Sequence, residues 1–164
     1  MNTDKLFVLL PEKYLEKIAS DHPDKVNWSL ASMSKQLSES FIEKYSDRVD
    51  WDHISRFQTL SESFIEKYTD RVNWLWISIK QKLSEPFIKK YQNKVDWDWI
   101  SEYQKLSESF IEKYKNRVNW RNISIYQKLS ESFIEKHAAR VDWDWIFEKQ
   151  TLSKEFKEKW RHKR

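Results

Sequence analysis

A tandem repeat with a strict 23-residue period constrains the fold of this chain more than any other feature. The motif Val-Asp/Asn-Trp recurs without insertion and starts at Val26, Val49, Val72, Val95, Val118 and Val141. A unit this short cannot bury its apolar face alone, so stacked neighbours must share a continuous core. The period predicts one domain of six units: 26–48, 49–71, 72–94, 95–117, 118–140 and 141–163.

Each unit carries two signals for the start of a helix. In the second unit, Asp50 and Ser61 stand four residues before Ile54 and Ile65. Short polar side chains followed by an apolar residue at this spacing are typical of helix N-caps, and Pro86 fits the first turn of a helix. Two starts 11 residues apart leave room for helices of about two to three turns. The predicted fold is all-α, a right-handed-type α-solenoid of six stacked two-helix repeats with atypical capping ends.

The apolar positions indicate which helix faces pack into the core. In the first helix, Trp51, Ile54 and Phe57 follow an i, i+3, i+6 pattern, and the second helix has the apolar stripe Phe-Ile-x-x-Tyr from Phe64. The Trp of the motif is interpreted as a core residue, with an aromatic ligand cage as the alternative. It occurs at Trp28, Trp51, Trp74, Trp97, Trp120 and Trp143.

Both ends of the array depart from the repeat. Residues 10–17 echo the sequence Leu-Ser-Glu-Ser-Phe-Ile-Glu-Lys, so residues 1–25 are predicted to form an N-terminal capping half-unit. In the last unit Phe147 replaces Ser and Lys157 replaces Ile. A charged residue at a stripe position indicates a face that no further repeat covers, so the array is expected to be complete.

The net charge of +4 lies at one end of the chain. Residues 154–164, a predicted basic C-terminal helix or tail, hold six Lys or Arg and two Glu, whereas the other residues hold 24 charges of each sign. A neutral body argues against binding along a phosphate backbone.

Two absent residue types exclude several function classes. Without Gly the chain cannot form the phosphate-binding loops or nucleophile elbows that enzymes build on it. Without Cys there is no disulfide or thiolate metal site, and the four His share no spacing. We therefore expect no enzyme activity, no cofactor and no metal. The longest apolar run, Leu6–Leu10, is too short for a membrane span or a signal peptide, so we expect a cytoplasmic protein.

The two repeated motifs, Val-Asp/Asn-Trp-x-x-Ile-Ser and Gln-Lys-Leu-Ser-Glu-Ser-Phe-Ile-Glu-Lys-Tyr, resemble short Trp-containing tandem repeats. These occur in mostly uncharacterised proteins of bacteriophages, large DNA viruses and some bacteria. The resemblance covers residues 26–163 and implies a helical repeat fold. It also implies a viral or mobile-element protein that acts on a host component in the host cytoplasm, and it carries over no catalytic residue.

Comparison of the units with one another separates constant from variable positions, which we count from the Val of the motif. The fourth, eighth and eleventh positions vary and lie on one face of the first helix. The fifth position is Trp in three units and His or Asn in two others. We predict that this face binds a partner, with a solvated face under no constraint as the alternative. The candidate residues are Asp52, Leu75, Trp76, Ile79, Asp98, Trp99, Glu102, Arg121, Ile125 and Trp145.

The units also alternate in pairs. The N-cap of the first helix is Asn in odd units and Asp in even ones, and the eighth position is apolar in odd units and charged in even ones. Duplication of a two-unit ancestor is one explanation. An apolar strip along the odd units, which would contact a partner, is the other.

Solenoids present extended surfaces and change specificity by surface substitution, so the predicted function is protein binding by a non-catalytic scaffold. The expected state is a monomer or a weak homodimer. The alternative is nucleic-acid binding through aromatic residues and the basic tail.

Overall fold

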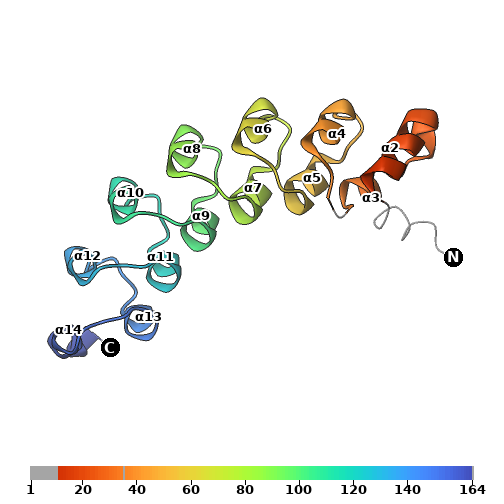
Figure 1. The fold of residues 1–164 in the computed structure, drawn as a ribbon. Coiled ribbons are helices and arrows are strands. Elements are labelled where there is room, and N and C mark those ends of the chain that lie inside the picture. The colour runs from red at the N-terminus through yellow and green to blue at the C-terminus, as the bar shows by residue number, and fades with distance from the viewer. Residues whose placement is uncertain (1–10, 35, 164) are drawn as a thin grey trace. The chain divides into compact units, whose positions relative to one another are not determined.

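The computed structural model describes residues 11–34 and 36–163, and these residues form helices and no strands. The chain divides into two compact units, Met1–Gln81 and Lys82–Arg164, and each is a stack of short helix pairs. In each stack the first helices of the repeats form one row and the second helices form another (Figure 1). The fold is therefore an all-α solenoid of two-helix repeats, as the sequence predicts.

The N-terminal unit begins with α2 (Glu12–Asp21) and the short 3₁₀ helix η1 (Pro23–Lys25). The first helices that follow are α3 (Trp28–Ser32), α5 (Trp51–Phe57) and α7 (Trp74–Lys80). The second helices are α4 (Glu39–Lys44) and α6 (Glu62–Lys67). Helix α5 packs against both α3 and α7.

The C-terminal unit repeats the same arrangement. Its first helices are α9 (Trp97–Tyr103), α11 (Trp120–Tyr126) and α13 (Trp143–Lys149). Its second helices are α8 (Glu85–Lys90), α10 (Glu108–Lys113), α12 (Glu131–Lys136) and α14 (Lys154–Lys159). The 3₁₀ helix η2 (Arg161–Lys163) follows α14, and α11 packs against both α9 and α13.

The predicted helix starts are confirmed by their capping hydrogen bonds. Asp50 accepts hydrogen bonds from the backbone N–H groups of Asp52 and His53, at 3.0 and 3.1 Å. Ser61 accepts one from the N–H of Phe64 at 3.2 Å. The helices are short, with seven residues in α5 and six in α6, so they are marginal alone and depend on packing.

Two Ile side chains per repeat form the centre of the core. Ile54 and Ile65 are fully buried, and so are the Ile residues at the same positions of repeats three to five: Ile77, Ile88, Ile100, Ile111, Ile123 and Ile134. The repeated Trp is half-buried, and it packs rather than lining a cage. The ring of Trp51 lies 4.8 Å from that of Tyr68, and its Nε1 donates a 2.9 Å hydrogen bond to the carbonyl of Ser46 in the preceding turn.

The prediction that the ninth position of the repeat lies in the core is wrong. Phe57 is 41% exposed, and its counterparts Tyr103 and Tyr126 are each 52% exposed. The helix ends at Phe57, and the extended backbone of the next residue turns Gln58 into the interior instead. The amide at the tenth position therefore takes the buried place that the i+6 pattern assigns to an aromatic ring.

These buried Gln side chains form a ladder that links each repeat to the one before it. In the C-terminal unit, Gln127 accepts a hydrogen bond from the backbone N–H of Leu106 at 3.1 Å. Its Nε2 donates to the carbonyls of Ser101 and Gln104, at 2.9 and 2.8 Å. One side chain thereby satisfies three buried backbone groups of the neighbouring repeat.

Two further ladders use the invariant Ser and Glu. Ser101 donates a 2.7 Å hydrogen bond to the carbonyl of Trp97 and accepts one from the N–H of Asn119, in the next repeat, at 3.0 Å. Glu108 accepts a 2.5 Å hydrogen bond from the N–H of Ser130, at the start of the following second helix. Sequence reasoning missed all three ladders, although the invariance of these polar residues was visible.

The first and last repeats depart from the ladder pattern. In the last repeat Phe147 and Lys154 stand at the positions of the ladder Ser and Glu, and Lys157 stands at the position of the core Ile. Lys154 and Lys157 are exposed. At the other end, Glu12 accepts a 2.5 Å hydrogen bond from the N–H of Ser38, and Leu15 is fully buried. The capping role of residues 1–25 stays a prediction, and residues 1–10 lie outside the described residues.

Candidate interaction face on the first helices

The exposed hydrophobic side chains gather on one side of the repeats. Among the described residues, five large hydrophobic side chains are exposed, and four of them belong to first helices: Phe57, Leu75, Tyr103 and Tyr126. Three are at the ninth position of their repeat. We call the fourth, fifth, eighth and ninth positions of the repeats the first-helix face.

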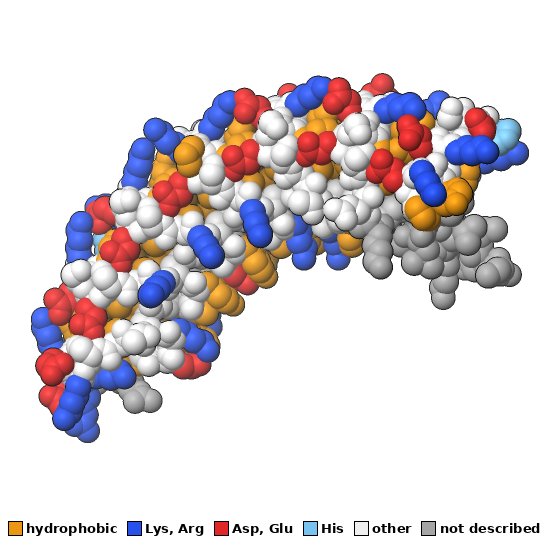
Figure 2. Space-filling model, in the orientation of Figure 1, with side chains coloured by type: hydrophobic (Ala, Val, Ile, Leu, Met, Phe, Trp, Pro, Cys, Tyr) orange, Lys and Arg blue, Asp and Glu red, His pale blue; other side chains and the backbone are white. Residues whose placement is uncertain are grey.

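The second helices are occupied by contacts between repeats. Lys44 pairs with Glu16 at 2.9 Å, and Lys67 pairs with Glu43. In each unit, basic side chains (Lys or Arg) alternate with acidic ones (Asp or Glu) over the second helices (Figure 2). Several of these charges are thus paired between neighbouring second helices.

The strongest of these clusters surrounds Glu112. Hydrogen bonds from Lys136 and Lys115, each at 3.0 Å, lower the pKa of Glu112 to about 2. The ring of His137 contributes a contact of 2.7 Å between its Nε2 and the carboxylate. Similarly, Lys159 and Trp160 lower the pKa of Glu135. Both carboxylates are therefore ionised and paired at neutral pH.

The predicted site residues all lie at the surface, but they differ in how free they are. Leu75 is 41% exposed, and Arg121 is exposed without an ion pair to any described residue. Ile79, Glu102 and Ile125 are half-buried. The pKa of Tyr103 is raised by a hydrogen bond with Glu102, which engages that carboxylate.

The fifth-position Trp side chains are half-buried and rest on neighbouring side chains. The guanidinium of Arg56 lies 4.4 Å from the centre of the Trp76 ring. The Trp99 ring lies 5.8 Å from that of Tyr103. The ammonium of Lys149 lies 5.4 Å from the Trp145 ring. One face of each ring is therefore already used within the chain.

Two acidic residues of the predicted site have a structural partner instead. The Nδ2 of Asn73 donates a 2.6 Å hydrogen bond to Asp52, and that of Asn119 donates a 2.8 Å hydrogen bond to Asp98. The N-caps of repeats three and five thus bind the fourth-position Asp of the even repeat before them. An Asp at the N-cap of these repeats would place its carboxylate beside that of Asp52 or Asp98. Contacts between neighbouring repeats therefore give a physical cause for the alternation of Asn and Asp at the N-cap. Sequence reasoning did not consider this cause.

Asn119→Asp is expected to lower the free energy of unfolding at pH 7 by about 0.5–1.5 kcal/mol, because a donor is lost and two carboxylates meet. Asp also serves as the cap in even repeats, so the capping itself is kept. Adding Asp98→Asn should restore most of the loss, as measured by urea unfolding of the double-mutant cycle. A double variant no more stable than Asn119→Asp would contradict this explanation.

The first-helix face of the C-terminal unit is hollowed between α11 and α13. The hollow has a volume of about 590 Å³, and Arg121, Ile125, Trp145 and Lys149 are among its lining residues. It therefore unites three predicted site residues from two repeats. A second hollow of about 330 Å³ adjoins it and shares Ile125 and Lys149.

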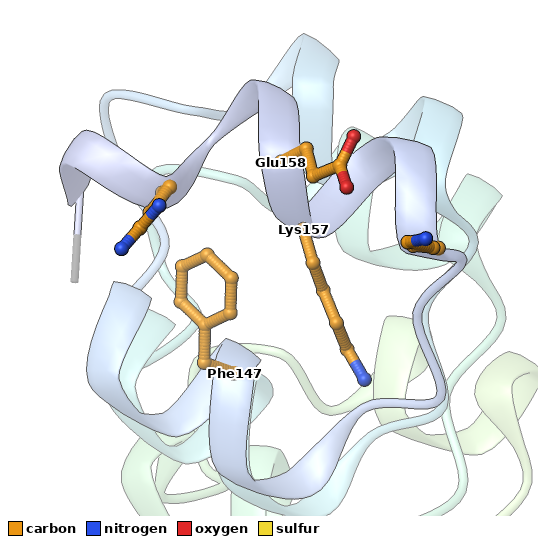
Figure 3. A pocket seen from close by; sticks show the side chains of 5 residues that line it. Phe147, Lys157 and Glu158 are labelled. Carbon is orange, nitrogen blue, oxygen red and sulfur yellow. The ribbon is translucent and has the colours of Figure 1, made fainter.

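A separate hollow lies at the C-terminal end, between α13 and α14. Phe147 reaches toward α14 and Lys157 reaches toward α13, whereas Glu158 points away (Figure 3). Lys154 and Arg161 complete the lining. Phe147 and Lys157, which line this hollow, occupy positions that the other repeats fill with Ser and Ile.

No group of three or more His, Asp or Glu side chains in the described part of the chain could hold a metal ion. Within residues 11–34 and 36–163, every helix is too short or too polar to cross a membrane. Comparisons of the chain with protein-family models, with curated proteins and with solved structures found no match.

Proposed function

We propose that the chain is a non-catalytic repeat scaffold that binds a protein partner through its first-helix face. The observation that carries the proposal is the separation of the two sides of the repeat. The Glu ladder and the ion pairs occupy the second helices. The exposed rings of Phe57, Tyr103 and Tyr126 lie on the first helices, whose Ser and Gln ladder residues are buried. Exposed aromatic and apolar side chains in a row are typical of protein interfaces.

The charge of this face supports a protein partner over a nucleic acid. The first helices and following linkers of the C-terminal unit, residues 97–105, 120–128 and 143–151, carry four acidic and four basic side chains. A nucleic acid presents a phosphate at every nucleotide and requires clustered positive charge. A neutral face with aromatic side chains suits a protein surface better.

The proposal predicts that Phe57→Lys, Tyr103→Lys and Tyr126→Lys together abolish partner capture without unfolding the chain. Repeats three and six carry Lys80 and Lys149 at this ninth position, so the fold already accepts Lys there. The measurement is affinity purification from an extract of the native cell, with captured proteins identified by mass spectrometry. Circular dichroism and the urea midpoint should stay near those of the original chain, within about 0.5 kcal/mol.

A matched control separates the face from the added charge. Ser63→Lys, Ser109→Lys and Ser132→Lys add the same three charges to exposed positions of the second helices. This control should capture the same proteins as the original chain. Equal capture by the first-helix variant would place the binding surface elsewhere, and capture of nucleic acid that nuclease removes would favour the alternative function.

A further inference from the structure

The eleventh position places a row of lysines beside the first-helix face of the C-terminal unit. Lys82, Lys105 and Lys128 occupy this position in three successive repeats, and all three are exposed. None of them pairs with an acidic group of the described residues, unlike Lys44, Lys67, Lys136 and Lys159 of the second helices. We call Lys82, Lys105 and Lys128 the lysine row.

The lysine row is accompanied by exposed aromatic rings and by hollows. Tyr103 and Tyr126 stand two residues before Lys105 and Lys128, and each is 52% exposed. Lys82, Leu83, Tyr103, Gln104 and Lys105 line a hollow of about 320 Å³.

The hollow of about 330 Å³ described above is the equivalent place 46 residues later, because Lys128, Leu129 and Gln150 repeat the positions of Lys82, Leu83 and Gln104. A lysine, a leucine and a Gln amide of the ladder thus line the hollow at both places.

This period matches one kind of extended chain. Packed helices lie about 8–10 Å apart, so the lysines of successive repeats recur about every 8–10 Å. A polyproline II helix has about three residues per turn and rises about 3.1 Å per residue, so its third residues recur on one side about every 9 Å. In a β-strand, by contrast, every third residue points to the opposite face.

We propose that the lysine row binds an acidic polypeptide segment in the polyproline II conformation, with an acidic residue at every third position. Its carboxylates pair with Lys82, Lys105 and Lys128, and the residues between them pack on Tyr103 and Tyr126. Aromatic-lined grooves recognise polyproline II segments in this way. The inference rests on the proposed function and names the chemistry of the partner.

Fluorescence anisotropy with the full chain tests the register. The probes are a labelled (Glu-Pro-Pro)₄ peptide, a peptide of the same composition with its four Glu at one end, and (Gln-Pro-Pro)₄. The regularly spaced acidic peptide is expected to bind at least about threefold more tightly than the clustered one, and (Gln-Pro-Pro)₄ should not bind measurably. Equal affinity for the two acidic peptides would overturn the proposed register.

Substitutions borrowed from other repeats test the residues. Lys82→Thr, Lys105→Thr and Lys128→Thr copy Thr59 and Thr151, which stand at the same position of repeats two and six. The triple variant should bind (Glu-Pro-Pro)₄ at least about tenfold more weakly, because each exposed ion pair accounts for roughly a two- to fivefold change in affinity. The Ser63→Lys, Ser109→Lys, Ser132→Lys control should bind like the original chain.

Three outcomes overturn the proposal in different ways. A labelled dT₁₂ that binds more tightly than the acidic peptide would assign the row to single-stranded nucleic acid. Unchanged peptide binding by the triple Thr variant would exclude the lysine row. Failure of all three peptides, while the first-helix variant still loses its captured protein, would refute this inference and leave the proposed function standing.

Discussion

Ile134→Lys is expected to unfold the C-terminal repeats, although the last repeat carries Lys157 at the same position. Ile134 is fully buried, whereas Lys157 is exposed beside Phe147. The variant loses the burial of a large aliphatic side chain, about 2–5 kcal/mol, and must also remove an ammonium from water. The total exceeds about 5 kcal/mol, which is comparable to the whole stability of a small domain. Circular dichroism at 222 nm and urea unfolding measure the loss.

The matched control is Lys157→Thr, which changes the same position where no repeat follows. Its urea midpoint should correspond to a change within about 0.5 kcal/mol, as for other exposed substitutions. A folded Ile134→Lys variant with an unchanged urea midpoint would show that burial by the next repeat is not required at this position.

The helix starts could be predicted from the sequence because capping is local. The hydrogen bonds of Asp50 and Ser61 reach only two or three residues along the chain, so their chemistry is visible in the spacing. The core Ile positions follow from the same periodicity. The exposure of Phe57 could not be predicted from periodicity alone, since it depends on where the helix ends and the backbone becomes extended.

The ladders were hidden because they join residues far apart in the sequence. Gln58 bonds to backbone groups 21 to 26 residues away, and its sequence neighbourhood resembles a polar surface. Invariance of a Gln within a repeat, at a position where no helix pattern demands it, was the available signal. Such a residue deserves a structural explanation before a functional one, because buried amides must satisfy their hydrogen bonds.

Variation between repeats pointed to one side of the first helices, and Leu75 and Arg121 are exposed there. That this side binds a partner stays a prediction. The exposed rings at the ninth position were assigned to the core, so variation did not identify them. Variation between repeats alone could not separate Asp98, which binds Asn119 of the next repeat, from side chains available to a partner. The residue types at two contacting positions of neighbouring repeats can vary together, as at Asp98 and Asn119. Only the structure shows that such positions are in contact.

Gln127→Leu is expected to lower the free energy of unfolding by about 3–6 kcal/mol, although Leu is nearly the same size and more hydrophobic. The substitution leaves the N–H of Leu106 and the carbonyls of Ser101 and Gln104 without partners in a buried place. Each unsatisfied buried group costs about 1–3 kcal/mol, which outweighs the gain from burying an apolar side chain. Urea unfolding monitored by Trp fluorescence measures the loss.

The same substitution at the end of the ladder supplies the control. Gln150 makes the same three hydrogen bonds, to the N–H of Leu129 and the carbonyls of Ser124 and Gln127, but it is only half-buried. Water can replace its amide there, so Gln150→Leu should cost about 1–2 kcal/mol. Equal losses at both positions would mean that burial does not set the strength of the ladder. A gain in stability at Gln127 would mean that apolar packing, rather than the amide ladder, holds adjacent repeats together.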